Sequence, residues 1–275
     1  MKTVQAGRAR IPALGLGTWK LRGREATEMV ARALAEGWRH IDTARMYGNE
    51  AEVGAGLRAA SVPRSEVFLT TKIWPDDHAP EALRAAAEDS LRKLGTDHVD
   101  LMLLHWPSKT VPLEETIPAL NRLVADGLAA HVGVSNFPRW QLREAARLSE
   151  TPLAVNQVEF HPFFDQSAML DLLAELGMAL TAYIPLARGK AAEDPTLARI
   201  GEAHGVSAAA VALAWILAKG AIAIPKTANP ARLAENAAAL DLTLAAGEIA
   251  EIDALAAGPR LVSDPSRPEL MPDWD

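Results

Sequence analysis

The sequence predicts a (β/α)8 TIM barrel that occupies residues 1–275 as a single domain. Short runs of Val, Ile and Leu alternate along the chain with longer segments of helical periodicity, which is the pattern of repeated βα units. The chain has 275 residues, of which 49% are hydrophobic, so it can bury one large core. A chain of this length suits one barrel better than two small domains.

Eight short apolar runs supply the eight parallel strands that such a barrel needs. They lie at residues 13–17, 39–43, 67–72, 99–105, 130–135, 154–159, 179–184 and 221–225. Segments of helical period lie between them, at residues 24–36, 80–94, 113–126, 139–148, 167–176, 207–218 and 230–240. Glycine follows several of these segments, as it commonly does where a helix ends. Beyond the repeat we expect an extra C-terminal helix at 244–255 and a Pro-rich surface tail at 258–275, folded over one face.

Composition narrows the function classes. The chain has no cysteine, which excludes a disulfide framework, a thiol nucleophile and a Cys-based metal site. A formal net charge of -7 argues against nucleic-acid binding. No apolar run reaches the roughly 18 residues of a membrane span, and the first residues lack the pattern of a signal segment. We therefore expect a cytoplasmic protein that binds a small molecule, with no membrane partner and no metal.

Four ionisable residues stand at or just after predicted strand ends. They are Asp42, Tyr47, Lys72 and His105. The carboxyl ends of the strands of a parallel barrel meet on one face, where active sites of this fold are built. Only two tyrosines occur in the whole chain, Tyr47 and Tyr183, and both fall at such ends. The sequence thus predicts one proton-transfer site at the barrel mouth.

These four residue types suit the reduction of a carbonyl group. A phenol has an ordinary pKa of about 10, and a nearby ammonium lowers it by favouring the phenolate. Lys72 would do this for Tyr47, and Asp42 would pair with the ammonium, since an unpaired buried charge is costly. His105 would donate a hydrogen bond to the substrate oxygen and polarise the carbonyl.

Two segments raise the question of phosphate binding. The pair Gly15 and Gly17 does not predict a Rossmann site, because no third glycine follows at the required place and no helix opens there. Residues 226–236 are the better candidate. There a strand end leads into a helix N-terminus with Lys226 and Arg232 nearby, and helix N-termini bind anions through free N–H groups.

Ordered motifs along nearly the full length resemble the aldo-keto reductase family, whose members carry an Asp, Tyr, Lys and His tetrad on a (β/α)8 barrel. The matching motifs are GLGTW (15–19), DTA (42–44), YGNE (47–50), TKIW (71–74), HWP (105–107), GVSNF (133–137), NQVE (156–159), IPKT (224–227) and EN (235–236). The brief segment after His105 and the endings at 260–263 and 272–275 look most like bacterial 2,5-diketo-D-gluconate reductases, particularly the B type associated with methylglyoxal reduction.

The resemblance implies a role for each matching residue. Tyr47 would be the general acid, tuned by Lys72 and Asp42, while His105 orients the carbonyl and NADPH supplies the hydride. Tyr183 would stack under the nicotinamide, and its carboxamide would be held by Ser135, Asn136 and Gln157. Further cofactor contacts are implied for Gly17, Thr18, Asp42 and Leu186, for Lys226, Thr227 and Arg232 at the 2′-phosphate, and for Glu235 and Asn236 at the adenine. Substrate contacts are implied for Trp19, Tyr47, Trp74, His105 and Trp106, with Trp274 ranked below them.

The sequence departs from the family pattern at Ile184 and at Ala187-Arg188-Gly189, where relatives have a small polar residue and a Gly-rich continuation. The cofactor contacts of this loop stay open. We expect a monomeric, NADPH-dependent reductase of small aldehydes, ketones or diketones, with the substrate itself undetermined. Two alternatives stay open: a class I aldolase with Lys72 as the Schiff-base lysine, and a non-catalytic NADPH-binding barrel. A zinc hydrolase is less favoured, because the histidines are scattered.

Overall fold

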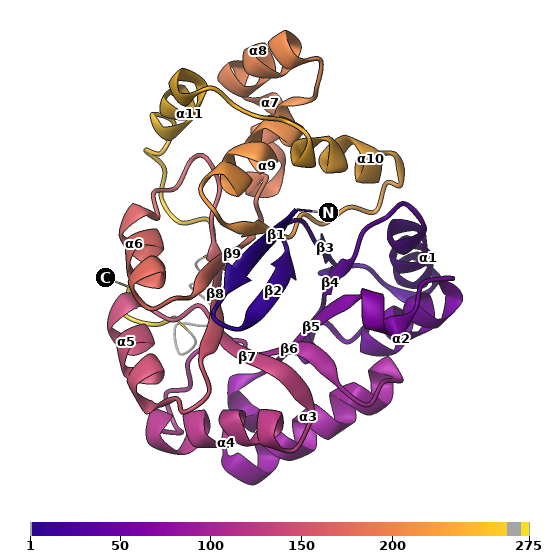
Figure 1. Ribbon diagram of the computed structural model, residues 1–275, viewed down its shortest axis with the longest axis vertical. Helices are drawn as coiled ribbons and strands as arrows, with labels where there is room; N and C mark the ends of the chain where they lie inside the picture. Colours follow the sequence, from indigo (N-terminus) through magenta and orange to yellow (C-terminus); the bar gives the residue numbers. More distant parts are fainter. Residues whose placement is uncertain (1, 263–270, 275) are drawn as a thin grey trace.

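The computed structural model describes residues 2–262 and 271–274, and it contains the predicted barrel (Figure 1). Eight parallel strands of the described chain pair in sequence order, and a bridge from Leu14 to Ala223 joins the two ends of the sheet. This confirms the (β/α)8 fold. The strands are β3 (Leu16–Gly17), β4 (His40–Asp42), β5 (Phe68–Ile73), β6 (Val99–Leu104), β7 (Ala129–Ser135), β8 (Leu153–Glu159), β9 (Ala179–Tyr183) and β10 (Ile222–Ala223).

Helices surround the sheet and bury their apolar faces against the outside of the strands. The predicted helices form close to their expected bounds, as α1 (Gly23–Ala35), α3 (Pro80–Leu94), α4 (Leu113–Ala125), α5 (Arg139–Leu148), α6 (Ser167–Glu175), α9 (Ala208–Ala218), α10 (Ala231–Ala237) and α11 (Ala246–Asp253). Three more helices were not predicted: α2 (Glu50–Ala59), α7 (Lys190–Glu193) and α8 (Pro195–His204). Helix α2 has a weak apolar pattern, with two glycines among its ten residues, and forms through its packing against α1.

A β-hairpin that the sequence did not predict closes one end of the barrel. It consists of β1 (Thr3–Ala6) and β2 (Ala9–Pro12), which pair in antiparallel fashion. Its buried residues Ala6, Ala9 and Ile11 pack with Leu103 and Val155 in the barrel interior. The hairpin, drawn in indigo, lies across the middle of the barrel in Figure 1. Ligands must therefore reach the barrel from its other end.

The strands that join the two ends of the sheet are shorter than predicted. Of the expected residues 13–17 and 221–225, only Leu16–Gly17 and Ile222–Ala223 are in strands. The chain passes very close here, because a Cβ on Gly17 would lie 2.9 Å from the carbonyl oxygen of Ile224. The Gly17 N–H donates to the carbonyl of Pro225 at 3.0 Å. Glycine is required at this position by close packing of the backbone.

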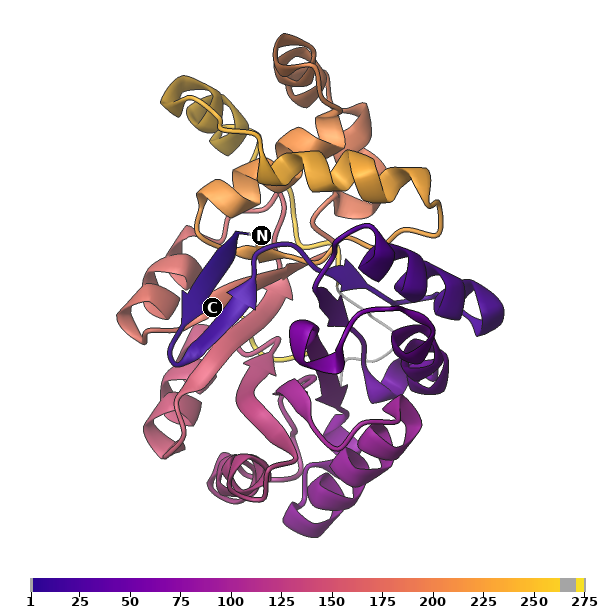
Figure 2. The same cartoon turned by 45° about the vertical axis from the view of Figure 1, so that its right-hand side comes forward.

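The described part of the tail lies at the end of the barrel opposite the hairpin. In Figures 1 and 2 it passes behind the strands, while the hairpin lies in front of them. Gly258 donates its N–H to the carbonyl of Phe163 at 3.0 Å, and Trp140 Nε1 donates to the carbonyl of Asp273 at 3.3 Å. Residues 263–270 and 275 of the predicted tail lie outside the described residues.

Within the described residues, no single helix is both long and apolar enough to cross a membrane. Helices α8 and α9 meet the criteria of length and composition only when taken together, and they are bent by 90° relative to each other.

Candidate active site

The structure brings the four predicted residues together at the carboxyl ends of neighbouring strands. Asp42 ends β4, Lys72 lies near the end of β5, and His105 directly follows β6. Tyr47 belongs to the 3-10 turn Arg45–Tyr47 that follows β4. Lys72 Nζ donates to Asp42 Oδ1 at 2.6 Å and lies 3.4 Å from the Tyr47 hydroxyl. The rings of Tyr47 and His105 have their centroids 5.7 Å apart.

The ion pair between Lys72 and Asp42 is fully enclosed by protein. The Lys72 side chain has no exposed surface, and Asp42 is buried as well. A buried ion pair is stable only where further hydrogen bonds satisfy its remaining donors and acceptors. Here Lys72 also donates to the carbonyl of Thr43 at 2.8 Å, and Gln157 Nε2 donates to Asp42 Oδ2 at 2.8 Å. The ammonium is therefore fixed beside the Tyr47 hydroxyl.

The pKa of Tyr47 is not lowered overall, as the pairing with Lys72 had led us to expect. Burial, together with the nearby Asp42 carboxylate, raises the pKa of Tyr47 well above its ordinary value. The physical reason is that the charge of Lys72 is already paired with Asp42, so loss of solvent contact outweighs it. At neutral pH the Tyr47 phenol is protonated and can therefore act as a proton donor.

His105 is a neutral imidazole. Burial is the main cause that lowers its pKa well below the ordinary value, and the neighbouring Lys72 ammonium adds to the effect. Its Nδ1 atom is buried and has no hydrogen-bond partner within the described protein. The ring packs edge-on against Trp74, with centroids 5.1 Å apart. A neutral imidazole in this place can orient a ligand oxygen without carrying charge into the site.

The residues expected to hold a nicotinamide form one network beside the tetrad. Asn136 Nδ2 donates to the His105 carbonyl at 3.0 Å and to Ser135 Oγ at 3.1 Å. The Tyr183 hydroxyl donates to Asn136 Oδ1 at 2.7 Å, and Ser135 Oγ donates to the Gln157 carbonyl at 2.8 Å. Since Gln157 also reaches Asp42, this network is continuous with the buried ion pair.

Thr18 and Leu186 border the same region. The N–H and Oγ1 of Thr18 both donate to the carbonyl of Asp42 at 3.0 Å, which fixes the chain after β3 against the end of β4. Leu186 lies in the loop after β9, where Ile184, Ala187 and Arg188 all have positive φ angles. Side chains rarely adopt this backbone region, so the departures from the family pattern coincide with a strained loop.

The expected phosphate site is only partly as predicted. Lys226 and Arg232 have exposed side chains at the start of α10, whereas Thr227 is buried. The first N–H groups of α10 are not free: that of Ala231 donates to Asn229 Oδ1 at 3.1 Å, and that of Arg232 to the Asn229 carbonyl at 3.1 Å. Anion binding by free helix N–H groups is therefore not available, and only side chains remain for that role. Glu235 is exposed and Asn236 is buried on the same short helix.

Aromatic side chains stand around the tetrad. The Trp19 ring lies 4.8 Å from that of Tyr47, and Trp74 contacts His105 as described. Trp106 is buried and lies 6.3 Å from Trp274 of the tail, centroid to centroid. Trp274 therefore contacts one of the three tryptophans ranked above it.

Sequence reasoning missed three buried polar residues that position the site. Asn49 donates to the carbonyls of Thr18 and Leu21 at 2.9 and 3.0 Å, which joins the segments after β3 and β4. Glu50 accepts from Thr71, next to Lys72, at 2.6 Å. Glu159, at the end of β8, accepts from two tail amides. The sequence did carry a signal for them: Asn49 and Glu50 end the YGNE motif, and Glu159 ends the NQVE motif. Polar residues inside a core need hydrogen-bond partners, so these positions could have been expected to position the site.

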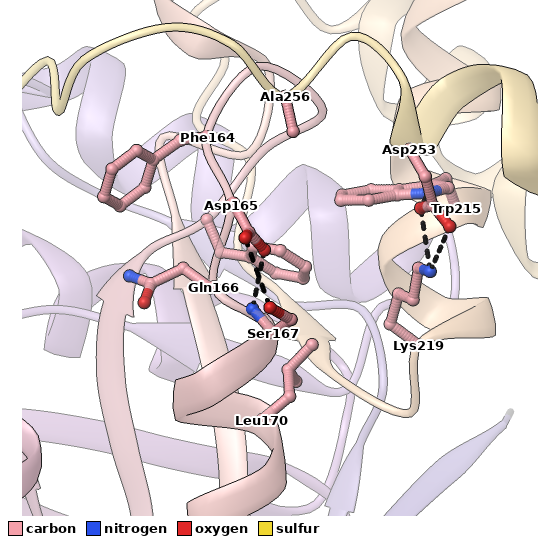
Figure 3. Close-up of a pocket in the computed structure, with 10 residues that line it drawn as sticks. Phe164, Asp165, Gln166, Ser167, Leu170, Trp215, Lys219, Asp253 and Ala256 are labelled. Carbon is pink, nitrogen blue, oxygen red and sulfur yellow. Dashed lines mark hydrogen bonds and ion pairs between the residues drawn. The ribbon is translucent and has the colours of Figure 1, made fainter.

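A separate cavity of about 290 Å³ lies on the outside of the barrel, between α6, α9 and α11 (Figure 3). Its charged groups already have partners: Lys219 forms an ion pair with Asp253, and Asp165 accepts from the N–H and hydroxyl of Ser167. None of its lining residues belongs to the tetrad or to the network around Tyr183. Among the described residues, no group of three His, Asp or Glu side chains is placed to hold a metal ion.

The site combines a protonated phenol, a buried ammonium and a neutral imidazole at the carboxyl ends of the strands of a (β/α)8 barrel. This is the arrangement of an oxidoreductase that interconverts carbonyls and alcohols.

Comparison with known proteins narrows this class to a family. The model of the aldo/keto reductase family matches residues 13–257. The chain is 41% identical to an aldo/keto reductase of Synechocystis sp., over 92% of this chain and 88% of that protein. It is 39% identical to the methylglyoxal reductase of Salmonella typhimurium, over 96% and 99%. A solved structure assigned as a 2,5-diketo-D-gluconic acid reductase B is 47% identical, with a TM-score of 0.95 and coverage of 99% and 98%. The chain therefore belongs to the aldo/keto reductase family.

Proposed function

We propose that this protein is an NADPH-dependent reductase of small aldehydes, ketones or diketones, of the methylglyoxal or 2,5-diketo-D-gluconate type. The observation that carries the proposal is the protonated Tyr47 hydroxyl held 3.4 Å from the buried Lys72 ammonium. The names of the relatives support the substrate class, since one is a methylglyoxal reductase and another is assigned to 2,5-diketo-D-gluconate. We further propose that residues 1–275 act as one domain, as a monomer in the cytoplasm.

The donors around Tyr183 fit a nicotinamide. An aromatic ring at the end of β9 stands beside the amide groups of Asn136 and Gln157 and the hydroxyl of Ser135, which together can accept from and donate to a carboxamide. The cations of Lys226 and Arg232 are exposed at the other end of this region and would bind the 2′-phosphate, with Thr227 beside them. Bound NADPH would supply the hydride.

The protein's own groups handle the proton. Tyr47 donates its hydroxyl proton to the substrate oxygen as negative charge develops there. The phenolate that remains is stabilised by Lys72, whose charge is otherwise held by Asp42. The neutral His105 orients the same oxygen, and the rings of Trp19 and Trp74 pack beside Tyr47 and His105.

The geometry around Lys72 speaks against the aldolase alternative. A Schiff-base lysine must be reached by the carbonyl carbon of its substrate and must react as the neutral amine. The Lys72 side chain has no exposed surface and already donates to Asp42 and the Thr43 carbonyl. A carbonyl could reach its nitrogen only by breaking both contacts.

The function is tested by a screen for NADPH oxidation across methylglyoxal, small aldehydes, ketoses and diketones. We expect substrate-dependent loss of nicotinamide absorbance with at least one small polar carbonyl and formation of the matching alcohol. Tight NADPH binding with no turnover on any member of the panel would instead favour the non-catalytic barrel.

Arg232→Ala is expected to weaken NADPH binding by about tenfold to a hundredfold, the effect of losing one hydrogen bond to a charged group. NADH lacks the 2′-phosphate, so its binding should change little. Dissociation constants for both cofactors provide the measurement, with Arg143→Ala as a control, because Arg143 is an exposed arginine paired with Glu175 on the outer helices. An equal loss for NADH and NADPH would show that Arg232 does not contact the 2′-phosphate.

The raised pKa of Tyr47 predicts different pH profiles for the two directions. Alcohol oxidation needs the phenolate, so its rate should rise with pH and reach no plateau below the ordinary phenol pKa of about 10. Reduction uses the protonated phenol, which is fully populated over the same range, so its rate should stay nearly flat. Lys72→Met should move the rise in oxidation to still higher pH, because the phenolate loses its neighbouring ammonium. Superimposable oxidation profiles for the wild type and Lys72→Met would show that Lys72 does not tune Tyr47.

A further inference from the structure

The tail brings one arginine to the mouth of the barrel. The guanidinium carbon of Arg260 lies 3.5 Å from the ring centroid of Trp274 and 4.8 Å from that of Phe164. A guanidinium stacked on aromatic rings is held in place by cation–π attraction. Trp274 in turn contacts Trp106, which directly follows His105. The Arg260 guanidinium also interacts with the phenol of Tyr183. Arg260 therefore lies between Trp274 and Tyr183, the ring expected to stack under the nicotinamide.

The backbone beside Arg260 is fixed by a buried carboxylate. Glu159 has no exposed surface, and its two oxygens accept from the N–H groups of Leu261 and Val262 at 2.6 and 2.7 Å. His161 Nε2 lies 3.1 Å from Oε1 of the same carboxylate. Although burial opposes it, these hydrogen bonds hold the pKa of Glu159 below its usual range. The tail is thus anchored at the residue next to Arg260, and the carboxylate that anchors it already has three hydrogen-bonding partners.

The charge of Arg260 is not matched within this part of the structure. Its Nη1 atom is buried and has no hydrogen-bond partner, and no carboxylate of residues 2–262 or 271–274 forms an ion pair with it. Glu159 attracts it only from a distance, and burial lowers the pKa of the guanidinium. A partly buried cation without an ion-pair partner still bears part of the cost of lost solvation. An anion that reached this position would remove that cost.

We propose that Arg260 is an anion subsite of the substrate pocket, which selects carbonyl substrates that also carry a carboxylate. The planar guanidinium matches a carboxylate in a two-pronged hydrogen bond, and Trp274 and Phe164 hold it in orientation. This inference rests on the proposed carbonyl reduction and adds a specificity-determining residue to it. The reacting carbonyl lies at Tyr47 and His105, and the carboxylate lies toward the tail.

The test compares a charged substrate with its neutral counterpart: 4-carboxybenzaldehyde and its methyl ester, reduced at constant ionic strength. In Arg260→Gln, kcat/KM for the carboxylate should fall by about tenfold to a hundredfold, the effect of losing a hydrogen bond to a charged group. The value for the ester should change little. Arg188→Gln is the matched control, because exposed Arg188 donates to the carbonyl of Leu261 at 3.2 Å and so contacts the same stretch of tail. It should leave the ratio of the two substrates unchanged.

Equal losses for both substrates in Arg260→Gln, or the same change of ratio in Arg188→Gln, would overturn the subsite. A wild type that reduces the ester but shows no preference for the carboxylate would also overturn it and leave the reductase assignment intact. If neither aldehyde is reduced, the subsite is tested without turnover. The binding of benzoate and of benzamide is then measured by tryptophan fluorescence. Tighter binding of benzoate by the wild type, lost in Arg260→Gln and kept in Arg188→Gln, supports the subsite. Equal binding of the two compounds by the wild type overturns it.

Discussion

Tyr47→Phe is expected to lower the rate of carbonyl reduction by about 10²-fold or more, the range of general acid catalysis. The substitution removes only the hydroxyl that lies 3.4 Å from Lys72 Nζ. The ring remains, with its contacts to Trp19 and His105. Because burial keeps the pKa of Tyr47 high, the phenol is protonated at neutral pH and can donate its proton to the substrate oxygen.

The measurement is single-turnover reduction with saturating NADPH, together with the dissociation constant for NADPH. Tyr183→Phe provides the comparison, because it removes the other tyrosine hydroxyl and its hydrogen bond to Asn136. We expect Tyr183→Phe to weaken cofactor binding more than turnover, and Tyr47→Phe to do the reverse. A Tyr47→Phe enzyme with near wild-type turnover would contradict the role of Tyr47 as proton donor.

Lys72→Met is expected to lower the free energy of unfolding by about 3–5 kcal/mol, the cost of breaking a buried ion pair from one side. The variant leaves the Asp42 carboxylate fully buried, with Gln157 as its remaining side-chain donor. Replacing both partners should be less harmful. In the double variant Lys72→Met/Asp42→Leu, no charge is left without its partner. We therefore expect the double variant to regain part of the free energy of unfolding that Lys72→Met loses.

Chemical denaturation of the two single variants and the double variant measures this coupling. Lys219→Met is the matched control, because Lys219 forms an ion pair with Asp253 on the surface, where such pairs contribute about 0–1 kcal/mol. Losses that simply add in the double variant would show that Lys72 and Asp42 do not act as a pair.

Much of the site could be predicted because parallel strands impose a simple geometry. Asp42, Lys72 and His105 follow from three apolar runs that each end on an ionisable residue, and the barrel brings those ends together. The position of Tyr47 depends in addition on the 3-10 turn that follows β4. The main strands and helices followed from periodicity, whereas the strands that join the sheet ends were shortened by close backbone packing at Gly17.

The errors concern properties that depend on surroundings. The sequence shows that a lysine faces the tyrosine, but the pKa of Tyr47 depends on how completely Asp42 pairs with that lysine and on burial. The free N–H groups expected at α10 are taken by Asn229, a local contact made by a loop side chain. The hairpin and the link from Glu159 to the tail depend on contacts between distant segments, and local patterns carry no information on them.

The central claim is that the barrel mouth carries out hydride transfer from a nicotinamide to a carbonyl carbon, with the proton supplied by the protein. It is tested most directly by reduction of methylglyoxal with NADPH that carries deuterium at both hydrogen positions of the nicotinamide C4, followed by mass spectrometry of the product. We expect one deuterium on the carbinol carbon of the alcohol and an exchangeable proton on its oxygen. A product without deuterium, or cofactor oxidation without any alcohol, would contradict the assignment.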